Sequence, residues 1–306
     1  MASTSGISWT DATWNCLAGC EAVSPGCANC YAATMTRRLE AMGQKDYTGL
    51  TTAKHFNGTV RCLPDKLSIP LKWRKSRRVF VNSMSDLFHE DVPDEFIDRV
   101  FAVMALCPNH TFQVLTKRAE RMQAYMELLD IVRLSTAVGE FKPRVREDDP
   151  WLTPWREDVV APFERTGAIP NVWLGVSCER QQEADERIPW LLKTPAAVRF
   201  LSCEPLLGPI DLHGDIEKWA ADCWIYRGWH SRMDKVNPIQ WVIVGGESGG
   251  NRRSCQLAWI TSIVEQCKAA GVPVFVKQDA ALRSGKQGRI PDDVWATKEF
   301  PAIQEA

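Results

Sequence analysis

The sequence has no long apolar run and no excess of charge of one sign. No uninterrupted apolar segment approaches the roughly 20 residues that a membrane-spanning helix needs, so we expect no membrane partner. The first residues, MASTSGISWTDATWN, lack the basic region and apolar stretch of a secretory signal, which favours a cytoplasmic protein. The 37 Lys and Arg residues balance 38 Asp and Glu residues, to a net charge of −1. This balance excludes a basic surface over the whole molecule but allows a local basic patch for nucleic acid.

The sequence also has no internal repeat, and its 306 residues suffice for a single large domain over 1–306. Short apolar, β-branched runs alternate with segments of helical periodicity, a pattern that predicts an α/β fold with a parallel sheet. The expected strands are 79–83, 111–116, 171–177, 197–202, 240–245 and 272–277, and the expected helices are 28–43, 93–107, 118–129, 179–193 and 257–271. Two stretches rich in Trp and charge, 131–170 and 208–238, are expected to be irregular insertions, and 279–306 a C-terminal extension.

Polar residues follow nearly every expected strand. In parallel α/β folds the carboxyl ends of the strands carry the functional site, so we expect these side chains to share one polar mouth. The candidates are Ser83, Ser85, Asp86, Lys117, Arg118, Glu179, Glu204, Glu247, Lys277 and Gln278. Gly245 and Gly246 precede Glu247 and would let the backbone approach a ligand closely.

Four of the eleven cysteines, Cys16, Cys20, Cys27 and Cys30, crowd into fifteen residues. In a reducing compartment such a cluster indicates metal binding more than disulfide formation. Cys20, Cys27 and Cys30 on one loop can hold three irons of a 4Fe–4S cluster and leave the fourth iron open. With Cys16 included, a closed four-thiolate zinc site is the alternative, and a buried structural role for some of these cysteines is a third interpretation. The other seven cysteines, Cys178 and Cys203 among them, have apolar neighbours that are typical of buried thiols.

The segments WTDATWN (9–15) and GCEAVSPGCANCYA (19–32) resemble a phage-associated three-cysteine family of the radical S-adenosylmethionine superfamily, distantly similar to spore photoproduct lyase. Later segments, among them RVFVNSMSDLFHEDVPDEF, TFQVLTKRAERM, NVWLGVSCE, RFLSCEPLLGPIDL and WVIVGGESG, resemble that family in order and spacing. The resemblance implies a partial (β/α)6 TIM-like barrel of the radical S-adenosylmethionine type, with residues 9–15 as the first strand and two irregular insertions. Three departures are the six residues between Cys20 and Cys27, where three are usual, Cys16 where relatives more often have Pro, and the late position of Gly245-Gly246-Glu247.

The same resemblance implies the cofactors and a partner. Cys20, Cys27 and Cys30 would ligate a 4Fe–4S cluster, and S-adenosylmethionine would bind its open iron and be cleaved to a 5′-deoxyadenosyl radical. A flavodoxin- or ferredoxin-like protein would supply the electron. The candidate cofactor-binding residues are Ser83, Ser85, Asp86, Lys117, Glu179, Glu204, Gly245, Gly246 and Glu247. No catalytic residue and no oligomeric state follows from the sequence.

The segment 72–78, KWRKSRR, holds five positive charges and one Trp, which suits contact with nucleic acid phosphates. Together with the likeness to photoproduct lyase, this segment favours a nucleic acid base or nucleotide as substrate, for modification or repair. Two alternatives stay open at this point. One is a zinc- or cluster-containing nucleic-acid-binding protein without catalysis; the other is an enzyme on the same fold that uses the strand-end carboxylates without a radical.

Overall fold

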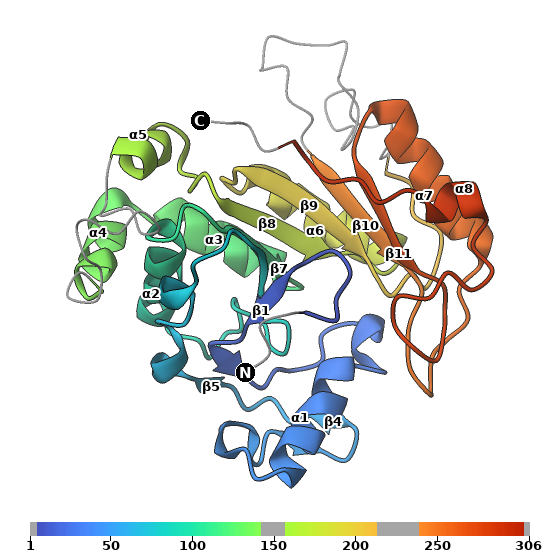
Figure 1. Ribbon diagram of the computed structural model, residues 1–306, viewed down its shortest axis with the longest axis horizontal. Coiled ribbons are helices and arrows are strands. Elements are labelled where there is room, and N and C mark those ends of the chain that lie inside the picture. The colour runs from blue at the N-terminus through green and yellow to red at the C-terminus, as the bar shows by residue number, and fades with distance from the viewer. Residues whose placement is uncertain (1–4, 142–156, 213–238, 303–306) are drawn as a thin grey trace.

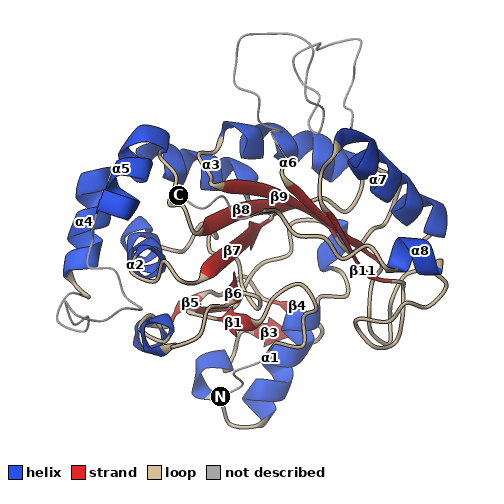
Figure 2. Cartoon of the chain, turned by 45° about the horizontal axis from the view of Figure 1, so that its top comes forward, coloured by secondary structure: helices blue, strands red, loops and turns tan. Residues whose placement is uncertain are grey.

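The computed structural model describes residues 5–141, 157–212 and 239–302. Its main sheet has seven parallel strands in the order β1-β6-β7-β8-β9-β10-β11. They are β1 (Ala12–Trp14), β6 (Arg78–Val81), β7 (Thr111–Thr116), β8 (Val172–Ser177), β9 (Val198–Cys203), β10 (Trp241–Gly245) and β11 (Val274–Gln278). The sheet curls into a half-barrel with helices along its outer side (Figures 1 and 2). The predicted α/β half-barrel is confirmed. The six strands of a (β/α)6 barrel are one too few, although the six expected apolar runs and the segment 9–15 together match all seven strands.

Alternation along the strands divides the sheet into two faces. In β6, Val79 and Val81 join the large core between sheet and helices, whereas Phe80 belongs to a second core cluster. The same alternation separates Val242 from Trp241 in β10. This second cluster fills the inside of the half-barrel and consists of Trp9, Phe80, Trp173, Val198, Phe200, Trp241, Ile243 and Phe275. Because both faces are buried, the strands appear in the sequence as almost continuous apolar runs, which is why they could be predicted.

The helices on the outer side follow the predicted pattern closely. They are α2 (Asp94–Ala105), α3 (Ala119–Leu128), α6 (Gln181–Lys193) and α7 (Leu257–Ala270), with α8 (Asp292–Trp295) near the end of the chain. Helix α2 follows Pro93 and has Asp94 and Glu95 in its first turn, where acidic side chains face the positive end of the helix dipole. Helix α7 ends at Gly271, whose φ of 68° is a left-handed conformation that glycine adopts easily.

The described parts of the segment 131–170 correct one expectation. Instead of an irregular insertion they contain two helices, α4 (Ile131–Gly139) and α5 (Glu157–Thr166), and α4 packs on α2 and α5. The carboxylate of Asp130 caps α4 by accepting a hydrogen bond of 2.8 Å from the Arg133 amide. Residues 142–156, and most of the other expected insertion, 213–238, lie outside the described residues.

Residues between β1 and β6 form a small addition that the sequence did not predict beyond its helix. Helix α1 (Tyr31–Ala41) is followed by the two-residue strands β3 (Thr51–Thr52) and β4 (His55–Phe56), which pair antiparallel. Strand β2 (Leu17–Ala18) pairs antiparallel with β5 (Arg61–Cys62). Four 3-10 helices join these elements: η1 (Pro25–Cys27), η2 (Lys45–Tyr47), η3 (Pro64–Lys66) and η4 (Pro70–Lys72). A third core cluster, which includes Tyr47, Leu50 and Met84, attaches this region to the end of β6.

The C-terminal segment 279–302 returns along the edge strand β11. The Val276 amide donates to the Thr297 carbonyl at 3.0 Å, and the Glu299 amide donates to the Val274 carbonyl at 3.1 Å. Phe300 then stacks on Trp241 and Phe275 at the amino ends of the strands. The segment therefore covers an edge that would otherwise present unpaired backbone groups. In the part of the chain that the structure describes, no helix has the length and apolar character of a membrane span.

The basic segment 72–78 lies at the amino end of the sheet, since Arg78 is the first residue of β6. Arg78 pairs with Asp11 at 3.2 Å, and the Arg77 guanidinium stacks over the Trp73 ring. A nucleic acid bound by this segment would therefore lie at the end of the sheet opposite the residues that follow the strands.

Candidate functional site

A cavity of about 390 Å³ opens at the carboxyl ends of the strands. Four strands supply polar groups to its wall from their last or next-to-last residue: Thr116 of β7, Ser177 of β8, Ser202 of β9 and Lys277 of β11. Its apolar lining includes Ile7, Trp9, Phe80 and Leu115. The cavity thus joins an apolar interior to a polar rim, as small-molecule sites commonly do.

The three predicted metal ligands line this cavity together. Cys20, Cys27 and Cys30 all contribute to its wall, and they come from one segment, residues 20–30, which we call the cysteine loop. Thiolates at Cys20 and Cys27 would each be close enough to Cys30 for mutual repulsion. Across the described residues, no three Cys, His, Asp or Glu side chains are already gathered at metal-binding distances.

Cys16 is separated from the other three. Its side chain is fully buried in the large core, and its thiol donates to the Asn82 side-chain oxygen at 3.4 Å. Burial raises the pKa of Cys16 to about 12, as it does at Cys20, but Cys16 packs in the core and does not line the cavity. A four-thiolate site would require Cys16 to leave the core, and the donor set fits a three-cysteine site better.

Electrostatics differ among the three cysteines of the loop. Burial raises the pKa of Cys20 to about 12, and burial also raises the pKa of Cys30. At Cys27 burial acts in the same direction, but the Lys117 ammonium and hydrogen bonds from Ser24 and the loop backbone outweigh it and lower the pKa of the thiol. Burial in turn lowers the pKa of Lys117 to about 8. Cys27 is thus the thiol that is most easily ionised in this loop.

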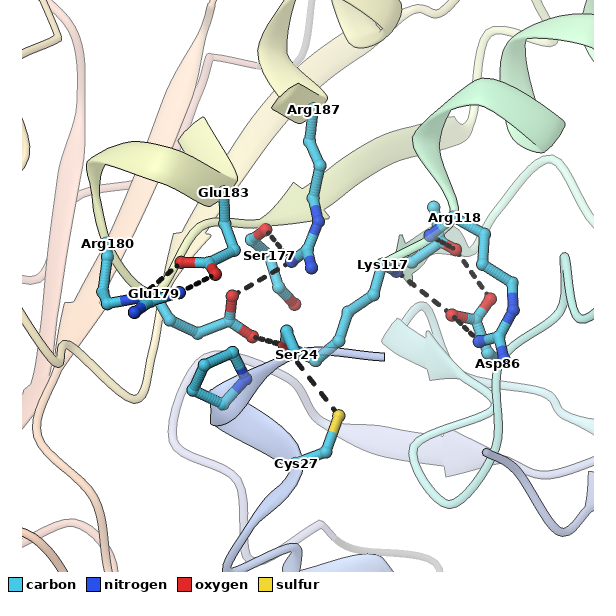
Figure 3. Close-up of polar contacts among 12 residues, drawn as sticks. Ser24, Cys27, Asp86, Lys117, Arg118, Ser177, Glu179, Arg180, Glu183 and Arg187 are labelled. Carbon is cyan, nitrogen blue, oxygen red and sulfur yellow. Dashed lines mark hydrogen bonds and ion pairs between the residues drawn. The ribbon is translucent and has the colours of Figure 1, made fainter. Parts of the chain in front are cut away.

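Glu179, a candidate for cofactor binding, does not line the cavity and contacts the cysteine loop. Its carboxylate is fully buried; it accepts a hydrogen bond from the Ser24 hydroxyl at 3.0 Å and pairs with Lys117 and with Arg187, the latter at 3.0 Å (Figure 3). Gly26 packs so closely on it that a Cβ atom there would be 2.3 Å from Glu179 Oε1. Glu179 therefore joins the cysteine loop to the end of β8.

Glu247 makes a second connection to the same loop. It accepts a hydrogen bond from the Asn29 side chain at 3.0 Å and is held by Arg253, whose guanidinium and amide donate to it at 2.6 to 3.0 Å. Arg253 also donates to the Pro25 carbonyl at 2.9 Å. These Arg253 contacts lower the pKa of Glu247 despite its burial. Glu247 lines the cavity as predicted, and its carboxylate is hydrogen-bonded to Asn29 of the loop and to Arg253.

Asp86 is buried and its carboxylate is used by neighbouring elements. It accepts hydrogen bonds from the Thr116 hydroxyl at 2.6 Å and the Lys117 amide at 3.1 Å, and it pairs with Arg118 at 3.2 Å. It lines the cavity, as does Ser85, whose hydroxyl donates to the Leu17 carbonyl at 3.3 Å. Asp86 thus joins the end of β6 to the end of β7.

Glu204 and Lys277 form the other charged part of the wall. The Lys277 ammonium and the Gln278 side chain donate to Glu204 at 2.6 and 3.3 Å. Both Glu204 and Lys277 line the cavity, Glu204 directly after β9 and Lys277 within β11. Among the predicted residues, this pair is the one best placed to meet a ligand inside the cavity.

Three other candidates lie outside the cavity wall. A Cβ atom on Gly246 would be 2.5 Å from the Ala280 amide nitrogen, and one on Gly245 would be 3.2 Å from the Gln278 backbone. Gly245 therefore allows close approach of β11, and Gly246 allows close approach of the backbone that follows β11. Ser83 donates to the Asn15 side chain at 3.2 Å, and its carbonyl accepts a hydrogen bond from Tyr31.

Several important residues were not found by sequence reasoning. Ser24, Asn29, Arg187 and Arg253 hold the cysteine loop to the sheet, and Tyr31 lines the cavity. Ser24 and Asn29 lie between the cysteines of the loop, so their place in the sequence could have indicated a role in this site. Arg187 lies within a helix and Arg253 in a polar loop, where charged residues are common and carry no signal of their own.

The sequence matches the family described as "Protein of unknown function (DUF5131)" over residues 4–295, and the chain belongs to that family. Comparison with curated proteins and with solved structures found no match.

Proposed function

We propose that this protein is a radical S-adenosylmethionine enzyme in which Cys20, Cys27 and Cys30 hold a 4Fe–4S cluster at the mouth of the half-barrel. The observation that carries the proposal is the gathering of these three cysteines, without Cys16, on the wall of one cavity at the carboxyl ends of the strands. Three thiolates leave one iron of such a cluster open, which suits it to bind a second ligand.

The donor set fits the cluster, and the cavity fits a small cofactor. When bound there by Cys20, Cys27 and Cys30, a reduced cluster would supply one electron to S-adenosylmethionine, so that its sulfonium C–S bond breaks to give methionine and a 5′-deoxyadenosyl radical able to remove hydrogen from a substrate. The protein contributes orientation, charge and exclusion of water. Glu204 and Lys277 present both signs of charge to the cavity, and Trp9 and Phe80 present aromatic surface to an adenine or another flat ring.

The substrate in this proposal is a nucleic acid base or nucleotide, which the aromatic interior and polar rim can accommodate. The reductant is a flavodoxin- or ferredoxin-like protein. The basic segment 72–78 lies at the other end of the sheet, so it contributes to substrate binding only if the nucleic acid extends around the molecule.

The first experiment measures iron and sulfide in protein purified without oxygen, and the EPR spectrum of the reduced protein with and without S-adenosylmethionine. We expect about four irons per chain, a spectrum that shifts with the cofactor, and release of 5′-deoxyadenosine. Cys27→Ala should abolish cofactor cleavage, whereas Cys16→Ala should retain it. Stoichiometric zinc without an EPR signal would instead support the binding protein without catalysis.

A further inference from the structure

We infer that Glu179 and Glu247 are positioning residues that hold the cysteine loop across the mouth of the half-barrel, and that they set the placement of Cys27. The inference rests on the proposed function for its meaning, because the position of Cys27 matters most if that thiol binds a cluster. Its evidence, however, is the set of contacts between the loop and two strand ends.

The first tether reaches the loop before Cys27. The Ser24 hydroxyl donates to Glu179 at 3.0 Å, and Gly26 leaves no room for a side chain against the same carboxylate. Glu179 cannot withdraw easily, because it is buried and paired with Lys117 and Arg187. The loop is therefore fixed against the end of β8 by a bond and by a steric contact.

The second tether reaches the loop on both sides of Cys27. After it, Asn29 donates to Glu247 at 3.0 Å and to the Asn251 carbonyl at 2.8 Å. Before it, the Pro25 carbonyl accepts a hydrogen bond from Arg253, which is itself bound to Glu247. Cys27 is thus placed between contacts to β8 and contacts to the segment that follows β10. Hydrogen bonds from the Cys27 and Ala28 amides to the Ser24 and Pro25 carbonyls keep the turn compact.

The chain offers a matched pair of glycine variants for the test. In Gly26→Ala the new methyl group would be 2.3 Å from Glu179 Oε1 and 2.7 Å from its Cδ atom, so the loop must move away from β8. Gly250→Ala lies in the segment after β10, where no atom is within 4 Å of the added carbon, and it serves as the control. Gly26 and Gly250 both lack the left-handed φ at which an alanine would be strained.

Hydrogen exchange gives a measurement that requires no cofactor. We expect the amides of Cys27 and Ala28 to exchange at least tenfold faster in Gly26→Ala than in the wild type, and at the wild-type rate in Gly250→Ala. Cluster stability is the second measurement. Loss of iron to a chelator should be about tenfold faster in Gly26→Ala, with a changed EPR line shape, and unchanged in Gly250→Ala.

Exchanging the amide and the carboxylate between positions 29 and 247 tests the second tether. Asn29→Asp places a carboxylate against Glu247 and should accelerate exchange of the loop amides. Glu247→Gln on that background supplies an amide that can donate to the new aspartate, and should restore slower exchange. Recovery in the double variant shows a direct contact, which general destabilisation of the fold would not produce.

The outcomes separate this inference from the proposed function. If the wild type binds a cluster and Gly26→Ala matches it in exchange and iron retention, the positioning role is wrong and the proposed function stands. If the wild type binds no cluster but the exchange rates change as expected, the tethers are real and the proposed function fails. If the wild type binds no cluster and Gly26→Ala leaves the exchange rates unchanged, the positioning role and the proposed function are both wrong.

Discussion

At the scale of single residues, the most consequential contact is the buried group of Glu179, Lys117 and Arg187. Glu179 has no solvent-exposed surface and neutralises two cations that are themselves largely buried. Removing one member of a buried ion pair leaves uncompensated charge, which typically costs about 3–5 kcal/mol. The carboxylate therefore contributes to stability as well as to the position of the cysteine loop.

We expect Glu179→Gln to lower the free energy of unfolding by about 3 kcal/mol, since Lys117 and Arg187 would face each other without a carboxylate. Urea denaturation followed by tryptophan fluorescence measures this. Asp46→Asn is the control, because the Asp46–Lys66 pair is partly open to solvent and should contribute about 1 kcal/mol or less. Equal effects for the two variants would contradict the buried-pair argument.

At the scale of helices and strands, the sequence predicted the parallel sheet well because its strands are buried on both faces and its helices carry ordinary end signals. The expected strand 111–116 and the observed β7 are identical, and the expected helix 257–271 differs from α7 only at its last residue. The same reasoning could not find the small strands between β1 and β6. Two-residue strands such as β3 and β4 have no periodicity to detect.

Only part of the candidate site could be predicted, because many of its contacts join residues that are far apart in the sequence. Spacing alone indicated the three cysteines, and polar residues after strands indicated the cavity wall. Glu179 and Glu247 were expected to meet cofactor, but they contact Ser24 and Asn29, which precede them by 155 and 218 residues. No local pattern encodes which side chains meet across such separations; the fold determines it. Gly246 illustrates the same limit, since its neighbours are the backbone atoms of Asp279 and Ala280, which follow β11.

The C-terminal segment provides the prediction at this scale. Phe300 packs on the rings of Trp241 and Phe275, each at 5.3 Å between centroids, and Arg78 lies 3.9 Å from its ring centre. Because Phe300 thereby connects β10 and β11 to the start of β6, Phe300→Ala should cost about 2 kcal/mol of unfolding free energy. Thermal unfolding would show the loss. Val132→Ala, at an exposed position, should change stability by about 0.5 kcal/mol at most.

At the scale of the whole molecule, stability should depend on pH through buried histidines. His110 lies between Trp73 and Phe112, with ring centroids 5.6 and 6.1 Å away, and is almost fully buried. Burial, aided by the charge of Arg77, lowers the pKa of His110 below its ordinary 6.5. Burial also lowers the pKa of His89, near Arg118. The fold therefore favours the neutral form of both imidazoles.

Proton uptake by these two histidines makes the folded protein less stable at low pH. The unfolded chain takes up these protons near pH 6.5, whereas the folded protein takes them up only at lower pH, so the stabilisation is complete above pH 6.5 and declines as the pH falls below it. Urea midpoints measured at several pH values between 8 and 5, with constant ionic strength, give the slope. His110→Phe should reduce the change of stability with pH below pH 6.5, and the remaining change is the one due to His89. His55→Gln is the control: His55 is exposed, so its replacement should leave the pH dependence as in the wild type. An unchanged slope in His110→Phe would mean that His110 can be protonated without unfolding its surroundings.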